Sequence, residues 1–83
     1  MMKKNIFSKT KDEFGEQIVY RFPNDYGASV IRSNFSYGGK RGLWELAVVK
    51  FENDVYEVLQ SEEIQGFLTE EKVNQMLKKI EAL

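Results

Sequence analysis

Hydrophobic and polar residues alternate over residues 17–22, and this period of two predicts a β-strand. Ile18, Tyr20 and Phe22 fall on one face of that strand, and the residues between them fall on the other. Less regular alternation and β-branched residues predict three more strands, at residues 26–35, 43–51 and 55–59. Polar turns at residues 23–25 and 52–54, and a glycine-rich segment at residues 36–42, separate the four strands.

The segment 43–51 is apolar at both odd and even positions, with only Glu45 and Lys50 polar. Such a run is typical of a central strand that is covered on both faces. One helix of about 14 residues is about 20 Å long and shields only one of those faces. The second face needs a cover from residues 1–16 or from another chain, and we expect a homodimer or another partner surface on that face.

A helix is predicted to follow Thr69, whose hydroxyl is suited to the N-cap position. Glu70 and Glu71 would lie at the positive end of the helix dipole. Apolar residues at helical spacing form one buried stripe: Val73, Met76, Leu77 and Ile80. Two shorter segments, Thr10–Glu13 and Ser61–Gly66, predict single helical turns.

The predicted order is β-β-β-β-α, with short connections between neighbouring strands. The fold class is therefore α+β: an antiparallel four-stranded β-meander with a single C-terminal α-helix packed on one face. The 83 residues suffice for a single domain, residues 1–83, in which residues 1–16 form a mobile or covering segment.

The composition removes most familiar catalytic and metal-binding chemistry. There is no cysteine and no histidine, so thiolate nucleophiles, imidazole bases and sulfur-ligated zinc are excluded. We expect no cofactor, no metal and no enzymatic activity. No secretory or membrane-spanning segment is recognised, so a cytoplasmic location is expected.

The segment Tyr37–Gly42 is the strongest candidate for a binding site. Gly38 and Gly39 allow backbone N–H groups to converge, and Lys40 and Arg41 add positive charge, so the loop is suited to an anion or a partner surface. The spacing of a P-loop is absent, and a strand follows instead of a helix. The simpler interpretation is a hairpin loop with solvated charges.

Aromatic and basic residues interleave around this loop, a pattern used to bind single-stranded nucleic acid. Beyond Tyr37, Lys40 and Arg41, the residues concerned are Arg32, Phe35 and Trp44. The aromatic positions of the RNA-recognition consensus are not matched, and the net charge of -1 provides no general attraction for a polyanion. A lone Trp on an apolar strand is most simply a core residue, although Trp also favours binding hot spots.

A distant alternative is a metal-dependent hydrolase that uses Asp25 with Glu70–Lys72. In such nucleases the Glu-x-Lys element lies on a strand, whereas here it opens a helix. The helix dipole explains the two acids more simply.

Four short segments resemble small proteins encoded by phages and prophages, especially of Gram-positive bacteria. The matching residues are Tyr26–Ile31 (YGASVI), Tyr37–Gly39 (YGG), Gly42–Val48 (GLWELAV) and Ile64–Val73 (IQGFLTEEKV). The resemblance implies an accessory protein that acts inside the bacterial host cell by binding a host factor. It supplies no catalytic residue to transfer.

These observations favour a non-enzymatic interaction module. Its partner would be a second copy of the chain or a host protein, bound through the sheet face or the Tyr37–Gly42 loop. The alternative is a binder of nucleotides or single-stranded nucleic acid through Lys40, Arg41 and the nearby aromatic residues.

Overall fold

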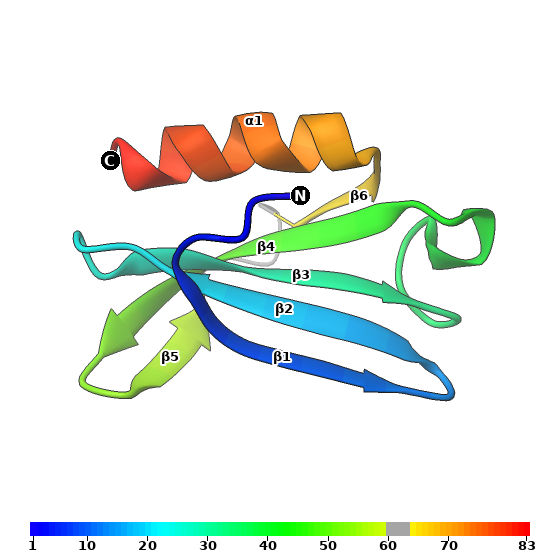
Figure 1. The fold of residues 1–83 in the computed structure, drawn as a ribbon, viewed down its shortest axis with the longest axis horizontal. Helices are drawn as coiled ribbons and strands as arrows, with labels where there is room; N and C mark the ends of the chain where they lie inside the picture. Colours follow the sequence, from blue (N-terminus) through cyan, green and yellow to red (C-terminus); the bar gives the residue numbers. More distant parts are fainter. Residues whose placement is uncertain (60–63) are drawn as a thin grey trace.

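The computed structural model describes residues 1–59 and 64–83, which form one antiparallel sheet with a helix across it (Figure 1). The elements are β1 (Ile6–Asp12), β2 (Gly15–Arg21), β3 (Tyr26–Ser33), the 3-10 turn η1 (Gly39–Arg41), β4 (Trp44–Glu52), β5 (Val55–Val58), β6 (Gln65–Leu68) and α1 (Glu70–Glu81). The α+β class and the C-terminal helix are confirmed. The number of strands is wrong, because the sheet has six strands and not four.

The first additional strand is β1, which lies where a single helical turn was expected. The Asp12 side chain accepts hydrogen bonds from the backbone N–H groups of Phe14 and Gly15, at 2.8 and 3.2 Å, and so closes a tight turn into β2. Almost every residue of β1 is exposed. An edge strand of this kind has no buried face and hence no hydrophobic period to reveal it.

The second additional strand is β6, which overlaps the helical turn expected at Ser61–Gly66. Residues 61–63 of that segment lie outside the described residues, whereas Gln65 and Gly66 belong to β6. The short strands β5 and β6 pair with opposite halves of β4: Val49–Glu52 pairs with β5, and the Trp44 end pairs with β6.

Strands β2, β3 and β4 form the regular centre of the sheet. Val19, Ser29 and Ala47 lie side by side across it, and the register of β3 is continuous on both sides. The irregularities lie elsewhere, between Ile6 and Ser8 and opposite the Trp44 end of β4.

The main core lies between α1 and the sheet. Val73, Leu77 and Ile80 of the helix pack on a face whose buried residues include Ile18, Tyr20, Phe22, Ala28, Val30, Trp44 and Leu46. Thr69 caps the helix as predicted, since its Oγ1 accepts a hydrogen bond from the Lys72 N–H at 3.2 Å. Each large apolar side chain buried in this core contributes about 1.5–3 kcal/mol to folding.

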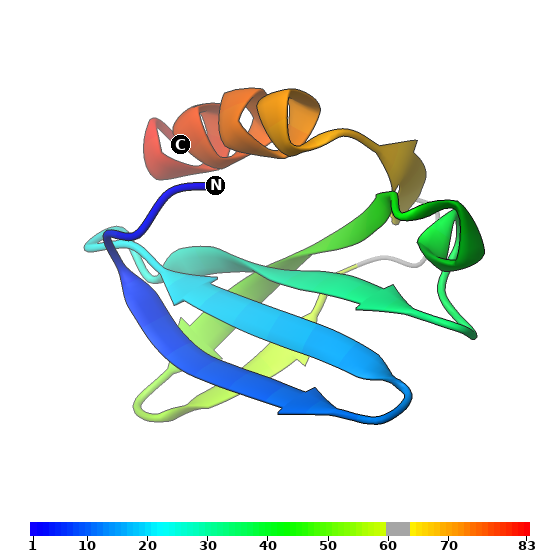
Figure 2. The same ribbon diagram turned by 45° about the vertical axis from the view of Figure 1, so that its right-hand side comes forward.

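A smaller cluster covers the other face of β4. Val19, Val49 and Phe51 are buried there, and the Phe7 ring meets the Phe51 ring edge-on with 4.9 Å between centroids. The ring centroid of Tyr56, on β5, lies 5.2 Å from that of Phe51. In Figure 2 the two edge strands, β1 and β5, lie on the side of the sheet away from the helix. The second apolar face is therefore covered within one chain, partly by residues 1–16.

The β2–β3 turn holds the C-terminal end of the helix. The Asn24 side-chain amide donates to the carbonyl oxygens of Ile80 at 3.0 Å and of Glu81 and Leu83 at 3.2 Å. These bonds satisfy carbonyl groups that a helix end leaves without partners. In the described part of the chain, no helix is long and apolar enough to cross a membrane.

Candidate binding site at the loop end of the sheet

The connection between β3 and β4 is a tightly bonded loop. Ser36 Oγ accepts a hydrogen bond from the Ser33 N–H at 2.9 Å, and the Tyr37 N–H donates to Glu45 Oε1 at 3.0 Å. The carbonyl oxygen of Gly38 accepts from both Arg41 and Leu43, each at 3.0 Å. These hydrogen bonds hold the loop backbone at several points between residues 33 and 43.

Glycine is required in this loop for two separate reasons. Gly38 and Gly42 flank η1 with φ of 88° and 76°, in the left-handed region that disfavours other residues. Gly38 also lies against β6, where an added Cβ would stand 2.8 Å from the Cα of Phe67. A Cβ on Gly42 would meet no atom within 4 Å. Packing on β6 thus explains Gly38, and positive φ explains Gly42, so neither glycine needs an anion in the loop.

Strand β6 presents Phe67 beside the loop in a strained conformation. The Phe67 N–H donates to the Tyr37 carbonyl oxygen at 3.1 Å, and Phe67 has a φ of 56°. A bulky residue with positive φ is uncommon and costs about 1–2 kcal/mol. The Phe67 side chain nevertheless remains 54% exposed, so burial of the ring does not compensate for this strain.

Two exposed aromatic side chains and two exposed cations surround a shallow hollow at this end of the sheet. Tyr37 is 66% exposed, and Lys40 and Arg41 are both exposed. The hollow has a volume of about 360 Å³ and is lined by Asn34, Ser36, Tyr37, Gly38, Lys40, Arg41 and Phe67. Figure 1 shows the loop and β6 meeting at the end of the molecule where α1 begins.

The structure separates Arg32 and Trp44 from this hollow. Trp44 is only 2% exposed, in the main core, as its simpler interpretation predicts. The Arg32 guanidinium lies 4.3 Å from the centroid of the Trp44 ring and pairs with the Glu16 carboxylate. The hollow therefore brings together Tyr37, Gly38, Lys40 and Arg41, with Gly39 beside it, whereas Arg32 and Trp44 belong to a neighbouring structural cluster.

Sequence reasoning missed the contribution of Phe67, to which the sequence analysis gave no role. Phe35, a candidate from the sequence, is 84% exposed. Its ring centroid lies 6.3 Å from that of Phe14 at the β1–β2 turn, a neighbour that sequence reasoning missed. The local signal for Phe67 and Phe14 was an aromatic residue next to a glycine, at Gly66–Phe67 and at Phe14–Gly15.

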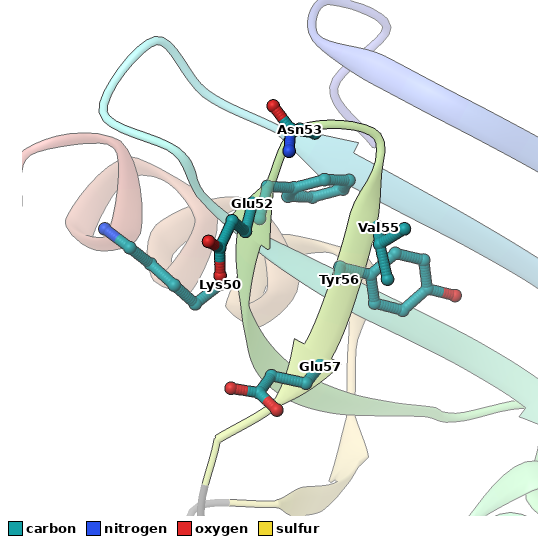
Figure 3. A pocket seen from close by; sticks show the side chains of 7 residues that line it. Lys50, Glu52, Asn53, Val55, Tyr56 and Glu57 are labelled. Carbon is teal, nitrogen blue, oxygen red and sulfur yellow. The ribbon is translucent and has the colours of Figure 1, made fainter.

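A larger hollow lies elsewhere, around the β4–β5 hairpin, with a volume of about 450 Å³. Figure 3 shows its side chains spread around both strands: Lys50, Glu52 and Glu57 on one side, and Val55 with Tyr56 on the other. The Lys50 ammonium also lies 4.0 Å from the centroid of the Tyr26 ring. The hairpin therefore offers a divided surface with one cation and two carboxylates, and its polar groups do not converge.

The carboxylates proposed for a hydrolase do not converge. Asp25 pairs with Arg21 at 3.2 Å in the turn that meets the C-terminal end of α1, whereas Glu70 begins that helix. Twelve residues of helix separate the two positions by about 18 Å. Within residues 1–59 and 64–83, no group of three or more acidic residues is placed to hold a metal ion.

One titratable group among the described residues has a clearly shifted pKa. Burial raises the pKa of Tyr20 above its ordinary value of 10.0, because the core disfavours the charged phenolate. The Tyr20 hydroxyl donates to the Met2 carbonyl oxygen at 2.7 Å. The Tyr20 side chain is fully buried, so this hydroxyl supports the fold and has no access to a ligand.

Comparison of the chain with protein-family models, with curated proteins and with solved structures finds no match.

Proposed function

We propose that this protein is a small non-enzymatic binding module that holds a protein partner at the hollow beside Tyr37 and Phe67. The observation that carries the proposal is the strained, exposed Phe67, held beside the exposed Tyr37. Strain at a site that gives no burial in return is typical of a residue retained for binding. Because the loop is already held by hydrogen bonds, it loses little conformational entropy when a partner binds.

The resemblance to small phage and prophage proteins supports a partner of host origin. A second copy of the chain is the other protein partner considered, and the molar mass in solution separates the two. A monomeric mass by light scattering at high concentration would leave the host protein as the partner.

The test is capture of partners from bacterial host extract by the wild-type chain, compared with Phe67→Asn. Asparagine accepts positive φ more readily than phenylalanine, so this variant removes the ring and retains the backbone conformation. We expect Phe67→Asn to fold with nearly unchanged stability and to lose the captured partner. Val55→Ser is the matched control, because Val55 is 73% exposed on the far hairpin.

Two outcomes would contradict the proposal. A partner captured equally by wild type, Phe67→Asn and Tyr37→Ser would place the binding surface elsewhere. A large fall in the stability of Phe67→Asn, with no change in binding, would assign Phe67 a structural role.

A second function, binding of single-stranded nucleic acid, is favoured by the proximity of Lys40 and Arg41 to Tyr37. Bases would stack on the aromatic rings while the two cations contact phosphates. Binding of a labelled 15-nucleotide oligothymidylate that weakens with salt and is lost in the double variant Lys40→Ala, Arg41→Ala would support it.

A further inference from the structure

We infer that the hollow beside Tyr37 and Phe67 recognises an acidic peptide segment with an apolar anchor residue. The inference rests on the proposed function and specifies the chemistry of the partner. The anchor would contact the two aromatic rings, and flanking Asp or Glu carboxylates would contact Lys40 and Arg41.

The charge distribution supports an acidic ligand. Within residues 1–59 and 64–83, Arg21 and Arg32 pair with carboxylates, whereas Lys40 and Arg41, like the other lysines of the described residues, have no ion-pair partner. The chain as a whole has 12 basic and 13 acidic residues, so two adjacent cations at one hollow form a local departure from a slightly acidic molecule. Such a local departure attracts a ligand of opposite charge.

The dimensions of the hollow support a peptide side chain. Its volume of about 360 Å³ is near the lower end of the roughly 300–1,000 Å³ range of small-molecule pockets. The hollow is shallow, so it can receive one anchor while the flanking residues lie across its rim. Tyr37 and Phe67 supply the apolar contact, and Arg is among the residues enriched at such interfaces.

The polar groups of the hollow are arranged on a rigid frame. The Arg41 N–H donates to the Gly38 carbonyl oxygen, and the Phe67 N–H donates to the Tyr37 carbonyl oxygen, so Arg41 and both rings stand on hydrogen-bonded backbone. A preformed site loses little freedom on binding, and a short linear peptide can then bind with measurable affinity. This arrangement favours an extended peptide over a polyanion that needs a longer basic track.

The experiment is selection from a displayed library of random 12-residue peptides with the full chain as target. Selected peptides are synthesised, and their dissociation constants are measured by fluorescence anisotropy at 50 and 500 mM NaCl. We expect enriched peptides to carry an aromatic or large aliphatic residue flanked by Asp or Glu. Their affinity should fall by about 5–30-fold in the double variant Lys40→Ala, Arg41→Ala, since each exposed charge pair contributes modestly.

The matched control is Lys78→Ala, Lys79→Ala, which removes the same charge from the exposed C-terminal turn of α1. It should leave the affinity unchanged, and thermal melting confirms that every variant is folded. Peptides without acidic residues, or binding insensitive to Lys40 and Arg41, would overturn the inference. If the peptides selected in that case still lose affinity in Phe67→Asn, the proposed function survives. If no selected peptide loses affinity in Phe67→Asn, the proposed function fails as well. Preferential binding of oligothymidylate over every peptide would overturn the inference in favour of nucleic acid.

Discussion

The backbone N–H of Phe67 donates a hydrogen bond to the carbonyl oxygen of Tyr37 at 3.1 Å. This single bond ties the β3–β4 loop to β6, two segments that are 30 positions apart in the chain. It also places two exposed aromatic rings beside Lys40 and Arg41. The stability of the loop and the shape of the candidate site therefore depend on the same contact.

Gly38→Ala should destabilise the protein much more than Gly42→Ala. Both glycines have positive φ, so each substitution costs about 1 kcal/mol in backbone strain. Only at Gly38 would the new methyl group also press on the Phe67 backbone, at 2.8 Å from its Cα. We expect a loss of about 2–4 kcal/mol for Gly38→Ala in urea unfolding. Equal losses for both variants would show that the loop does not pack on β6 as described.

Asn24→Ala should loosen the C-terminal end of α1. The variant loses the donor to three helix-terminal carbonyl groups and the acceptor for the Tyr26 N–H at 3.0 Å. We expect a loss of about 1–2 kcal/mol in the free energy of unfolding. Hydrogen exchange should increase in the last turn of α1 and remain unchanged in its first turn. Pro23→Ala, next to Asn24 and exposed, serves as the control.

Phe7→Ala should lower stability more than Phe35→Ala, although both residues are aromatic and partly exposed. Phe7 is 41% exposed and packs edge-on against Phe51, whereas Phe35 is 84% exposed. We expect a loss of about 1–2 kcal/mol for Phe7→Ala, and a change within about 0.5 kcal/mol for Phe35→Ala. Thermal melting of the two variants measures the difference. No effect of Phe7→Ala would mean that β1 does not cover the second apolar face.

Tyr20→Phe should remove part of the loss of stability at alkaline pH. Burial raises the pKa of folded Tyr20 above its unfolded value near 10.0, so the unfolded state releases this proton first. The stabilisation from neutral Tyr20 is therefore complete below about pH 10 and declines as pH rises from there through the folded pKa. Wild-type stability should fall more steeply above pH 10 than that of Tyr20→Phe.

At neutral pH the same variant loses the bond from the Tyr20 hydroxyl to the Met2 carbonyl oxygen, which costs about 1 kcal/mol. Urea unfolding at a series of pH values between 7 and 11 measures both effects. Parallel pH profiles for the two proteins would contradict the assigned burial of Tyr20.

The sequence predicted the helix and the central strands because their residues repeat with a clear period. Val73, Leu77 and Ile80 fall on one helical face. Thr69 caps the helix by accepting a hydrogen bond from Lys72, three positions along the chain. The two-faced apolar pattern of residues 43–51 likewise predicted a central strand with cores on both sides, as the structure confirms. These features depend on local spacing, which a sequence records directly.

The sequence could not predict β1 and β6, because neither has the alternation of a half-buried strand. Residues of β1 are mostly exposed, and β6 has a register shift at Gly66–Phe67 opposite Trp44 and Leu46. Backbone pairing with β2 and β4 determines both strands, and side-chain pattern carries little information about such pairing. The expected site was located by its glycines and cations, but Phe67 entered it only through that pairing.

The amino-acid sequence by itself therefore determined the α+β class, the central strands, the capped helix and the position of the glycine-rich loop. Tertiary structure alone decided how Phe7 covers Phe51, how Asn24 caps a helix 56 residues away, and how Phe67 meets Tyr37. Each of these contacts joins segments far apart in the chain. The stabilisation from these contacts arises only when the backbone has folded, so no local sequence pattern predicts them.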